Sequence, residues 1–462
     1  MGDGSDFEFL LAFYADDFTG ATDALEGLAR NGVRAVLFLD APTEADLARF
    51  NDIDAVGVAG TTRSMPPDRM GLELSDAFRS LDELDVPLVH YKVCSTFDSS
   101  PEIGSIGRAI DVGQNVFESS YVPVSQPTTA PSYRYVAFGN LFAEFEGSVY
   151  RLDRHPTMNT HPTTPMAESD LRRHLERQTD KPMGLIALPV LESTTAARDA
   201  LNKARGDGEV IVFDGVSKEH LERVGRLIWD DATEETGTFF AVGSSGLEHD
   251  ALTAHWESTG VVDDASSLLE LQPSADAIAV TSGSVSTETA AQIEHAVDAG
   301  FEGIRLDTPR LVDPDAAADA RKSTVERATE AINDRRSVVM YTAKGPDDPA
   351  IDETLERFET AGVSGSIVSC LGRQQGMILR ELIERTELSR CCVAGGDTSS
   401  HVVSTLDVDA LTPLGPISPG SPICRTISSV DAFDGLEFVL KGGKSSERDY
   451  FDIVRRGGSR QY

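Results

Sequence analysis

Short apolar segments alternate with segments of helical periodicity along the whole chain. In the first half the apolar segments cover 35–39, 55–60, 88–94, 133–140, 184–190, 209–214 and 239–246, with helical stretches such as 67–81 and 168–178 between them. In the second half they cover 277–283, 337–343, 391–399 and 437–443, with helical stretches at 288–299, 315–332 and 375–386. Strands that alternate with helices are typical of a parallel sheet, because a helix usually supplies the crossover between parallel strands. The pattern predicts an α/β fold.

The length of the chain and one irregular segment predict two domains. A chain of 462 residues is too long for one ordinary core, and hydrophobic residues make up 40% of it, which is enough to fill more than one. Residues 260–272 are mixed and acidic and follow no period. We therefore expect two α/β domains with mainly parallel sheets, at 6–260 and 273–455, joined by this linker.

The charge of the chain excludes several partners. The formal net charge is -35, from 76 acidic and 41 basic residues, which argues against nucleic acid or an anionic membrane as a partner. No apolar run is long enough to span a membrane, and the acidic N-terminus lacks a signal-peptide pattern. The five cysteines form no CxxC pair, and an odd number argues against a disulfide framework. We expect a cytoplasmic protein, and the dispersed acidic surface with few lysines predicts a halophilic one.

Two adjacent carboxylates follow the first predicted strand. The apolar run 9–14 ends at Asp16 and Asp17, and a helix with apolar positions at helical spacing then runs to Asn31-Gly32. Ligands bind at the carboxyl ends of strands in an open α/β sheet, and two buried carboxylates there are costly unless a ligand, metal or cation uses them. The alternative is that one of them only caps the helix.

Polar residues also follow other predicted strands of the first half. They are residues 61–63, 92–100, 214 and 243–246, and together they would line one rim of the sheet. The segment 151–166 has no regular period and carries two His-Pro pairs, at His155 and His161. It is either an anion-binding lid or a rigid surface loop.

Three loops of the second half are rich in glycine and small hydroxyl residues. They are 282–286, 394–400 and 443–446, and each follows a predicted strand. Such loops bind phosphate through exposed N–H groups, although each could also be a tight turn. Neither GxxxxGK[ST] nor a GxGxxG after the first strand is present, and lysines stand at 441 and 444. The loops predict a nucleotide site of another kind, and the Pro/Gly segment 414–422 is expected to be a shaped loop that forms a wall for the base or ribose.

Several motifs together resemble the four-carbon acid sugar kinase family. They are ADDFTGATD, YKVCST, SGSVSTETAAQI, AGGDTSS, PISPGSP and LEFVLKGGK, in the order of the family and over nearly the whole chain. The resemblance implies an N-terminal domain that binds a sugar acid, a C-terminal domain that binds ATP, and an active site in the cleft between them. It implies transfer of the γ-phosphoryl group to a terminal hydroxyl of a tetronate or 3-oxo-tetronate.

The chain departs from the family pattern in two places. The usual DSTLRG is replaced by CSTFDS at 94–99, so that an Asp and an Arg are missing and Asp98 is added. The usual KSGNFG is replaced by KGGKSS at 441–446. These differences indicate a branch that acts on another acid sugar, such as a branched 3-oxo acid of the 3-oxo-isoapionate type.

Phosphoryl transfer needs neutralised phosphates, an oriented hydroxyl and usually a carboxylate that accepts the proton. Asp17 or Asp16 is the candidate base, while Cys94 is expected to be a small buried apolar residue. The candidate substrate-binding residues are Arg63 and Lys92 for the carboxylate, and Ser95, Thr96 and Asp98 for hydroxyls. The candidate nucleotide-binding residues are Ser282, Gly283, Ser284, Gly395, Gly396, Asp397, Thr398, Gly442 and Gly443, with Asp397 as the Mg²⁺ ligand.

Two other classes of protein remain open. An NAD(P)-dependent oxidoreductase would show the dinucleotide fingerprint, which is absent. A non-catalytic protein that binds a sugar acid and a nucleotide would not need both the carboxylate pair and three phosphate-type loops. A homodimer is a further expectation.

Overall fold

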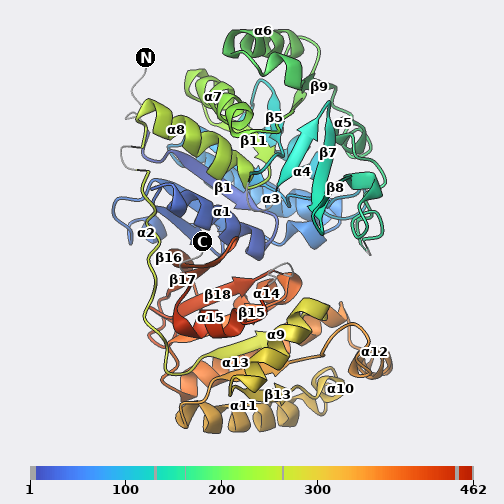
Figure 1. Ribbon diagram of the computed structural model, residues 1–462, viewed down its shortest axis with the longest axis vertical. Helices are drawn as coiled ribbons and strands as arrows, with labels where there is room; N and C mark the ends of the chain where they lie inside the picture. Colours follow the sequence, from blue (N-terminus) through green and yellow to red (C-terminus); the bar gives the residue numbers. More distant parts are fainter. Residues whose placement is uncertain (1–6, 130–132, 162, 263–264, 443–446, 460–462) are drawn as a thin grey trace. The chain divides into compact units, whose positions relative to one another are not determined.

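The computed structural model describes residues 7–129, 133–161, 163–262, 265–442 and 447–459 (Figure 1). The chain divides into two compact units, Met1–Leu268 and Leu269–Tyr462. Both units are α/β folds with helices around a mainly parallel sheet, as the alternation of strands and helices predicts.

The main sheet of the N-terminal unit is parallel in every strand pair of the unit. Its strands lie in the order β2 (Ala35–Phe38), β3 (Ala55–Ala59), β1 (Leu11–Ala15), β4 (Leu88–Lys92), β11 (Phe239–Gly243), β5 (Val122–Ser125), β10 (Val210–Phe213) and β9 (Met183–Ile186). Ala15 is in register with Ala59 and Lys92, and Lys92 with Gly243. Four strands therefore end side by side, which confirms the predicted rim.

Helices connect these strands. They are α1 (Phe18–Arg30), α2 (Glu44–Leu47), α3 (Pro67–Asp82), α4 (Ile106–Phe117), α5 (Leu171–Leu175), α6 (Thr194–Ala204), α7 (Lys218–Glu234) and α8 (Thr253–Thr259), with 3₁₀ turns η1 (Thr62–Ser64), η2 (Leu152–Arg154) and η3 (Leu188–Val190) and a π-helical segment η4 (Leu247–Leu252). The aromatic rings of Tyr14, Phe78, Tyr91 and Phe240 pack beside the central strands, with centroids 5.3–6.0 Å apart.

The N-terminal unit also contains a small antiparallel sheet. It consists of β6 (Arg134–Ala137), β7 (Asn140–Phe145) and β8 (Ser148–Arg151). The prediction of residues 133–140 as one strand of the main sheet was wrong, because Phe138 and Gly139 adopt positive φ values of 52° and 81° and turn the chain back into a hairpin.

The sheet of the C-terminal unit is parallel at one side and antiparallel at the other. Its strands lie in the order β13 (Glu302–Arg305), β14 (Val338–Tyr341), β12 (Ala279–Ser282), β15 (Arg390–Ala394), β18 (Glu437–Lys441), β17 (Ser421–Ile427) and β16 (Ala410–Ser418). The pairs from β13 to β18 are parallel, and β17 is antiparallel to β18 and β16.

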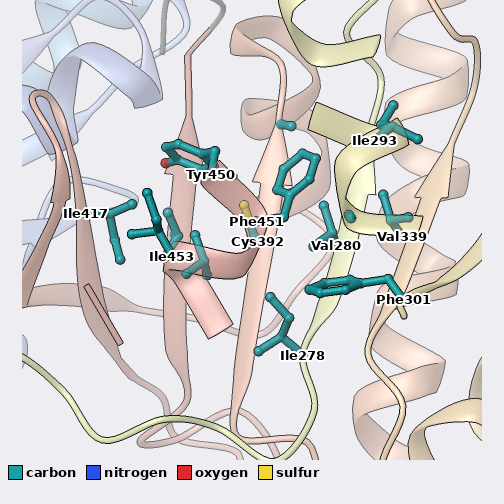
Figure 2. Close-up of a cluster of buried hydrophobic side chains, with 14 of the residues drawn as sticks. Ile278, Val280, Ile293, Phe301, Val339, Cys392, Ile417, Tyr450, Phe451 and Ile453 are labelled. Atoms are coloured by element: carbon teal, nitrogen blue, oxygen red, sulfur yellow. The ribbon is translucent and has the colours of Figure 1, made fainter. Parts of the chain in front are cut away.

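The helices of this unit are α9 (Thr287–Asp298), α10 (Thr308–Leu311), α11 (Ala317–Asn333), α12 (Ala350–Ala361), α13 (Ile367–Arg385), α14 (Gly396–Val403) and α15 (Tyr450–Arg456). Figure 2 shows Tyr450, Phe451 and Ile453 of α15 in the buried cluster that also contains Val280 of β12 and Cys392 of β15. The core thus joins the last described helix to the central strands.

The segment 414–422 is not the loop that its Pro/Gly content predicts. It forms the turn and the adjoining ends of the β-hairpin of β16 and β17, closed by the pair Ser418 and Ser421 with Gly420 at φ 78°. The register shifts twice, between Pro413 and Gly415 and again before Ser418. Such irregularities accommodate prolines that cannot donate to a regular ladder, which is why the strand was missed.

Candidate active site

Asp16 and Asp17 leave the carboxyl end of β1 and are both buried, with 2% and 9% of their surface exposed. Asp17 is the N-cap of α1: its Oδ1 accepts a hydrogen bond from the N–H of Gly20 at 2.8 Å, and its Oδ2 accepts one from Thr19 Oγ1 at 2.7 Å. Capping of α1 is therefore one role of Asp17. It does not account for Asp16, nor for the remaining partner of the two carboxylates.

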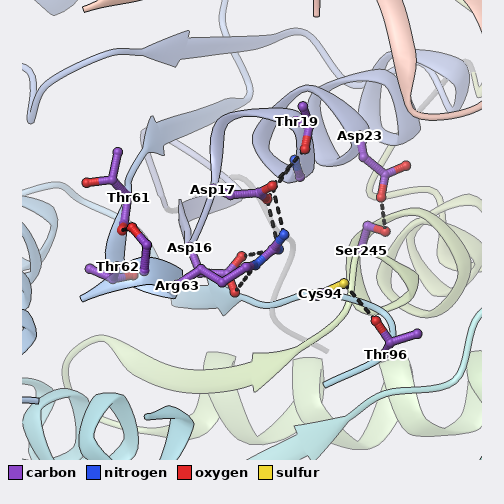
Figure 3. Close-up of polar contacts among 12 residues, drawn as sticks. Asp16, Asp17, Thr19, Asp23, Thr61, Thr62, Arg63, Cys94, Thr96 and Ser245 are labelled. Atoms are coloured by element: carbon purple, nitrogen blue, oxygen red, sulfur yellow. Dashed lines mark hydrogen bonds and ion pairs between the residues drawn. The ribbon is translucent and has the colours of Figure 1, made fainter. Parts of the chain in front are cut away.

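That partner is Arg63, which lies in η1 just after β3. Its Nε and Nη2 donate to Asp16 at 3.1 and 2.7 Å, and its Nη1 and Nη2 donate to Asp17 at 2.8 and 2.9 Å. Figure 3 shows the guanidinium facing both carboxylates. Four of its five N–H groups are thereby used, so Arg63 has little left for the carboxylate of a substrate.

The pKa values of the two carboxylates are shifted in opposite directions. Burial raises the pKa of Asp16 above its ordinary value, against the opposing charge of Arg63. Burial also acts on Asp17, but the charges of Arg63 and Lys92 and the hydrogen bond from Thr19 lower the pKa of Asp17 below its ordinary value. The side chain of Asp17 is 13% exposed and that of Asp16 only 3%. Asp17 is thus the more accessible carboxylate of the pair, and the one whose ionised form its surroundings favour.

Lys92 ends β4 and is only 3% exposed. Its ammonium lies over the first turn of α1, because a Cβ placed on Gly20 would be 2.2 Å from Lys92 Nζ and 2.3 Å from Asp17 Oδ1. Among the described residues, no hydrogen-bond partner is found for this ammonium. A buried cation beside a carboxylate and a helix N-terminus is suited to an anionic ligand.

We expect Gly20→Ala to abolish most activity without unfolding the chain. Alanine favours a helix by about 1 kcal/mol over glycine, yet here the methyl would displace Lys92 Nζ and Asp17 Oδ1. Turnover at saturating substrates and the melting temperature are the measurements. A variant that is as active as the wild type would show that these two groups need not lie so close.

The segment 94–98 continues from β4 along the same rim. Cys94 Sγ and Thr96 Oγ1 share a hydrogen bond of 3.0 Å, and Cys94 is half-buried, so the expectation of a buried apolar residue was wrong. Ser95 is half-buried and Thr96 is buried. Phe97 is fully buried at φ 59°, a strained backbone for a non-glycine residue. The Oδ1 atom of Asp98 is buried and has no partner among the described residues.

Neighbouring side chains hold this segment in place. Ser99 Oγ contacts His174 Nε2 at 2.8 Å and accepts from Gln178 Nε2 at 3.1 Å. Burial lowers the pKa of His174 to about 4, so its ring is neutral near pH 7. The strained turn at Phe97 is therefore supported by a hydrogen-bonded network.

Sequence reasoning placed residues 243–246 at this rim without giving Ser245 a role, and it missed Asp23 and Arg134. Ser245 Oγ donates to Asp23 Oδ2 at 2.5 Å and ties the end of β11 to α1. Arg134 of β6 pairs through its backbone with Thr128, two residues after Gln126, whose amide donates to the carbonyl of Cys94. The spacing of Ser245 after a strand was a usable signal, whereas the position of Arg134 depends on the missed hairpin.

The histidine-containing loop is held together internally. His155 Nδ1 accepts from the N–H groups of Thr157 and Met158 at 3.3 Å, and His161 Nδ1 accepts from the N–H of Thr164 at 3.1 Å. His155 is 5% exposed and packs edge-on against Phe145. These contacts favour the rigid loop over the anion-binding lid.

In the C-terminal unit, β12, β15 and β18 end together. Ser282 is in register with Ala394, and Ala394 with Lys441. The N–H of Gly283 donates to Ala394 at 3.0 Å, and the N–H of Gly395 donates to Lys441 at 2.9 Å. The predicted nucleotide-binding loops that follow these strands are thus brought together where they are described.

The glycines Gly283 and Gly395 allow the two loops that follow β12 and β15 to lie close together. A Cβ on Gly283 would lie 2.2 Å from Thr398 Oγ1, and Gly395 adopts φ 123° just before α14, which begins at Gly396. Ser282 Oγ is buried without a partner among the described residues. The side chain of Asp397 and residue Gly443 lie outside the described residues, as do Lys444, Ser445 and Ser446.

Buried Lys441 lies beneath these loops. Its Nζ donates to Thr289 Oγ1 at 3.4 Å and to the carbonyl of Gly442 at 3.2 Å, and Thr289 Oγ1 donates to Ser284 Oγ at 3.0 Å. Burial lowers the pKa of Lys441 from its ordinary value. A cation, hydroxyls and backbone N–H groups therefore surround the loop of Ser284, which is suited to phosphate.

A cavity of about 200 Å³ adjoins Gly283 and Thr398. Its wall is largely apolar and includes Val285, Ala343, Ile351, Leu355, Val368 and Leu371. Such a wall beside a phosphate-type loop suits the flat base of a nucleotide. Residues 414–422, expected to form that wall, are not among those that line it.

Among the described residues, no group of three or more His, Cys, Asp or Glu side chains could hold a metal ion. The described loops offer hydroxyls, N–H groups and the ammonium of Lys441, which suit the phosphates of a nucleotide. No helix in the described parts of the chain is long and apolar enough to cross a membrane.

The candidate phosphate site of one α/β unit and the buried carboxylate–arginine cluster of the other are features suited to a two-domain phosphotransferase, and comparison with known proteins identifies the family. The profile of a sugar-binding N-terminal domain matches residues 11–251, and that of a nucleotide-binding C-terminal domain matches 279–451. The chain belongs to the four-carbon acid sugar kinase family, and is an ATP-dependent kinase of small sugar acids.

Two relatives cover nearly the whole chain. The 3-oxo-isoapionate kinase of Paraburkholderia graminis is 43% identical over 97% of this chain and 94% of its own length. The 3-oxo-tetronate kinase of Methylobacterium radiotolerans is 32% identical over 96% of this chain and 97% of its own. The family favours the kinase over the oxidoreductase and the non-catalytic binding protein.

Solved structures show the same fold. A crystal structure from Salmonella typhimurium LT2, described under a provisional tRNA synthase name, has a TM-score of 0.78 and 26% identity, and covers 97% of this chain and 99% of its own. The Haemophilus influenzae protein has a TM-score of 0.70 at 23% identity, with 96% and 99% covered.

Proposed function

We propose that this chain phosphorylates a terminal hydroxyl of a branched 3-oxo acid of the 3-oxo-isoapionate type. The supporting observation is the identity of 43% to a 3-oxo-isoapionate kinase, against 32% to the 3-oxo-tetronate kinase of Methylobacterium radiotolerans. The departure at residues 94–99 lies beside Asp16 and Asp17 and is consistent with a different substrate.

In the proposed reaction, the hydroxyl oxygen attacks the γ-phosphorus of ATP and the bond to the β,γ-bridging oxygen breaks, so that ADP leaves. The hydroxyl proton passes to Asp17, which is ionised and the more exposed of the pair. Asp16 accepts a hydrogen bond from Arg63 and holds it in place. Lys92, whose ammonium lies near Asp17, would stabilise a negatively charged group of the ligand. Ser95 and Thr96 remain proposed hydroxyl ligands.

The nucleotide is proposed to bind in the C-terminal unit, with its phosphates at Ser282–Ser284 and Gly395–Thr398 and its base in the neighbouring cavity. Gly442 and Gly443 are further proposed contacts. Mg²⁺, when bound with ATP, supplies charge neutralisation on the phosphates, and Asp397 is the proposed ligand. An active site in the cleft between the domains stays a prediction.

The test is ATP consumption with Mg²⁺ in high-salt buffer against tetronates, 3-oxo-tetronates and branched five-carbon 3-oxo acids. We expect the highest kcat/KM with the branched 3-oxo acid. A preference for an unbranched 3-oxo-tetronate would overturn the proposed substrate. ADP formation without any acid acceptor would instead indicate ATP hydrolysis.

Three further properties are proposed. The net charge of -35 with eight lysines supports a protein suited to high salt. Melting temperatures that do not rise with salt would contradict the proposed adaptation to high salt. A cytoplasmic location is proposed as well. A homodimer is also proposed, and the mass in solution tests it.

A further inference from the structure

Arg134 is a buried arginine that the catalytic proposal leaves unused. Its backbone is fixed, because its N–H donates to the carbonyl of Thr128 at 3.2 Å and the N–H of Thr128 donates back at 3.1 Å. Only 7% of its surface is exposed. Its Nη1 donates to the carbonyl of Tyr133 at 2.9 Å, while its Nε is buried without a partner among the described residues. A buried guanidinium with unused donors is costly unless a ligand satisfies it.

Unused acceptors lie around the same segment. Asp98 Oδ1 and Gln126 Oε1 are buried and have no partner among the described residues. Gln126 Nε2 donates to the carbonyl of Cys94 at 2.7 Å, which places the amide against the segment 94–98. Burial lowers the pKa of Arg134, against the opposing charge of Asp98. One unused donor thus accompanies two unused acceptors.

This set of atoms is complementary to a sugar acid. The carboxylate and keto oxygens of such a molecule only accept hydrogen bonds, and its hydroxyls can donate them. The N–H groups of Arg134 would donate to the carboxylate or keto oxygens. The oxygens of Asp98 and Gln126 would accept from the hydroxyls.

The segment 94–98 also links Arg134 to the reacting carboxylates. Lys92 is in register with Ala15, so the segment 94–98 follows a strand next to the one that carries Asp16 and Asp17. The hydrogen bond of Gln126 to the carbonyl of Cys94 and the backbone pairing of Thr128 with Arg134 connect the β6 hairpin to the same segment. Arg63 spends four N–H groups on Asp16 and Asp17 and is poorly suited to a further carboxylate. Arg134 has the donors that Arg63 lacks.

We propose that Arg134 binds the carboxylate of the sugar acid, while Asp98 and Gln126 bind its hydroxyls. This inference rests on the proposed function as a sugar-acid kinase, and it names the groups that distinguish the acid from an uncharged sugar. It assigns to an arginine of the β6 hairpin the role that the sequence suggested for Arg63. The missing arginine of the 94–99 motif is thereby compensated from another element.

The test compares the acid that the wild type turns over with its uncharged primary amide. For each, kcat/KM is measured in the wild type, Arg134→Met and Arg134→Lys. We expect Arg134→Met to raise the KM for the acid about 10- to 100-fold, since a hydrogen bond to a charged group is lost. The KM for ATP should stay the same, and the preference for acid over amide should fall by a similar factor.

Arg134→Lys should keep part of that preference, because the charge remains but the two-pronged geometry is lost. Arg177→Met, which removes an exposed arginine of the same unit, is the matched control and should keep the wild-type ratio. If Arg134→Met fails to fold, the ratio of kcat/KM for the acid to that for the amide in Arg134→Lys tests the inference.

Two results would overturn the inference. One is an acid-to-amide preference that both Arg134 variants leave unchanged. The other is a loss of preference in Lys218→Met, which would place the ligand in the cavity of about 110 Å³ that Lys218, Tyr133 and Arg134 line. An inactive wild type on every acid would overturn the proposed function, and this inference with it.

Discussion

Asp17→Asn is expected to lower kcat about 10²- to 10⁴-fold, which is the usual contribution of a positioned general base. Asparagine caps a helix about as well as aspartate, so the N-terminus of α1 should survive the substitution. Asp17 is held by Gly20, Thr19 and Arg63, and its amide replacement occupies the same space without accepting a proton. The measurement is steady-state ATP consumption with the preferred acid, alongside thermal melting.

The control for this prediction is Asp54→Asn. Asp54 forms another aspartate–arginine pair in the same unit, with its Oδ1 2.8 Å from Arg34 Nη2, but this pair is exposed to solvent. Its loss should leave kcat unchanged, which separates the loss of an ion pair from the loss of a base. If Asp17→Asn retains more than a tenth of the wild-type kcat, another group accepts the proton, and Asp16→Asn becomes the decisive variant.

Gly283→Ala is expected to raise the KM for ATP strongly and to leave the KM for the acid nearly unchanged. The added methyl would lie 2.2 Å from Thr398 Oγ1 and 3.1 Å from its Cβ and Cγ2, so one of the two loops must move. Overpacking usually costs about 1–3 kcal/mol, or a factor of about 5 to 150 in affinity. Kinetics at varied ATP and calorimetric titration with ADP measure the effect.

A second substitution separates the clash between the added methyl and Thr398 from a general loss of stability. Thr398→Ala removes the Oγ1 and Cγ2 atoms, so the double variant Gly283→Ala/Thr398→Ala should recover part of the affinity that the single variant loses. Gly303→Ala, on β13 of the same sheet, meets only a methyl of Val297 at 2.9 Å and should not alter the KM for ATP. A double variant that binds ADP no better than Gly283→Ala would contradict this account.

The parts of the site that follow strand ends could be predicted from the sequence. A strand that is followed by two aspartates and then a helix places both aspartates at the carboxyl end of a parallel sheet. Asp16 and Asp17 lie at this position, between β1 and α1. The same logic brought the loops after β12 and β15 together. Residues at the ends of parallel strands are neighbours even when they are far apart in the chain.

The partners of these residues could not be predicted in the same way. Arg63 was assigned to a substrate carboxylate, but whether it points to a ligand or to Asp16 depends on side-chain distances that the sequence does not carry. Arg134 was missed because the turn at Phe138 and Gly139 gives no decisive signal within residues 133–140. The hairpin of β16 and β17 was missed because prolines normally interrupt strands.

The order of the strands in each sheet constrains how the protein folds during translation. In the C-terminal unit, β18 lies between β15 and β17, and in the N-terminal unit β11 lies between β4 and β5. In each sheet, the strand that is translated last lies between strands that are translated earlier. The nascent chain must keep a gap in each sheet until residues 243 and 441 emerge, and a product that stops before Glu437 would leave β15 and β17 with unpaired edges, which favours aggregation.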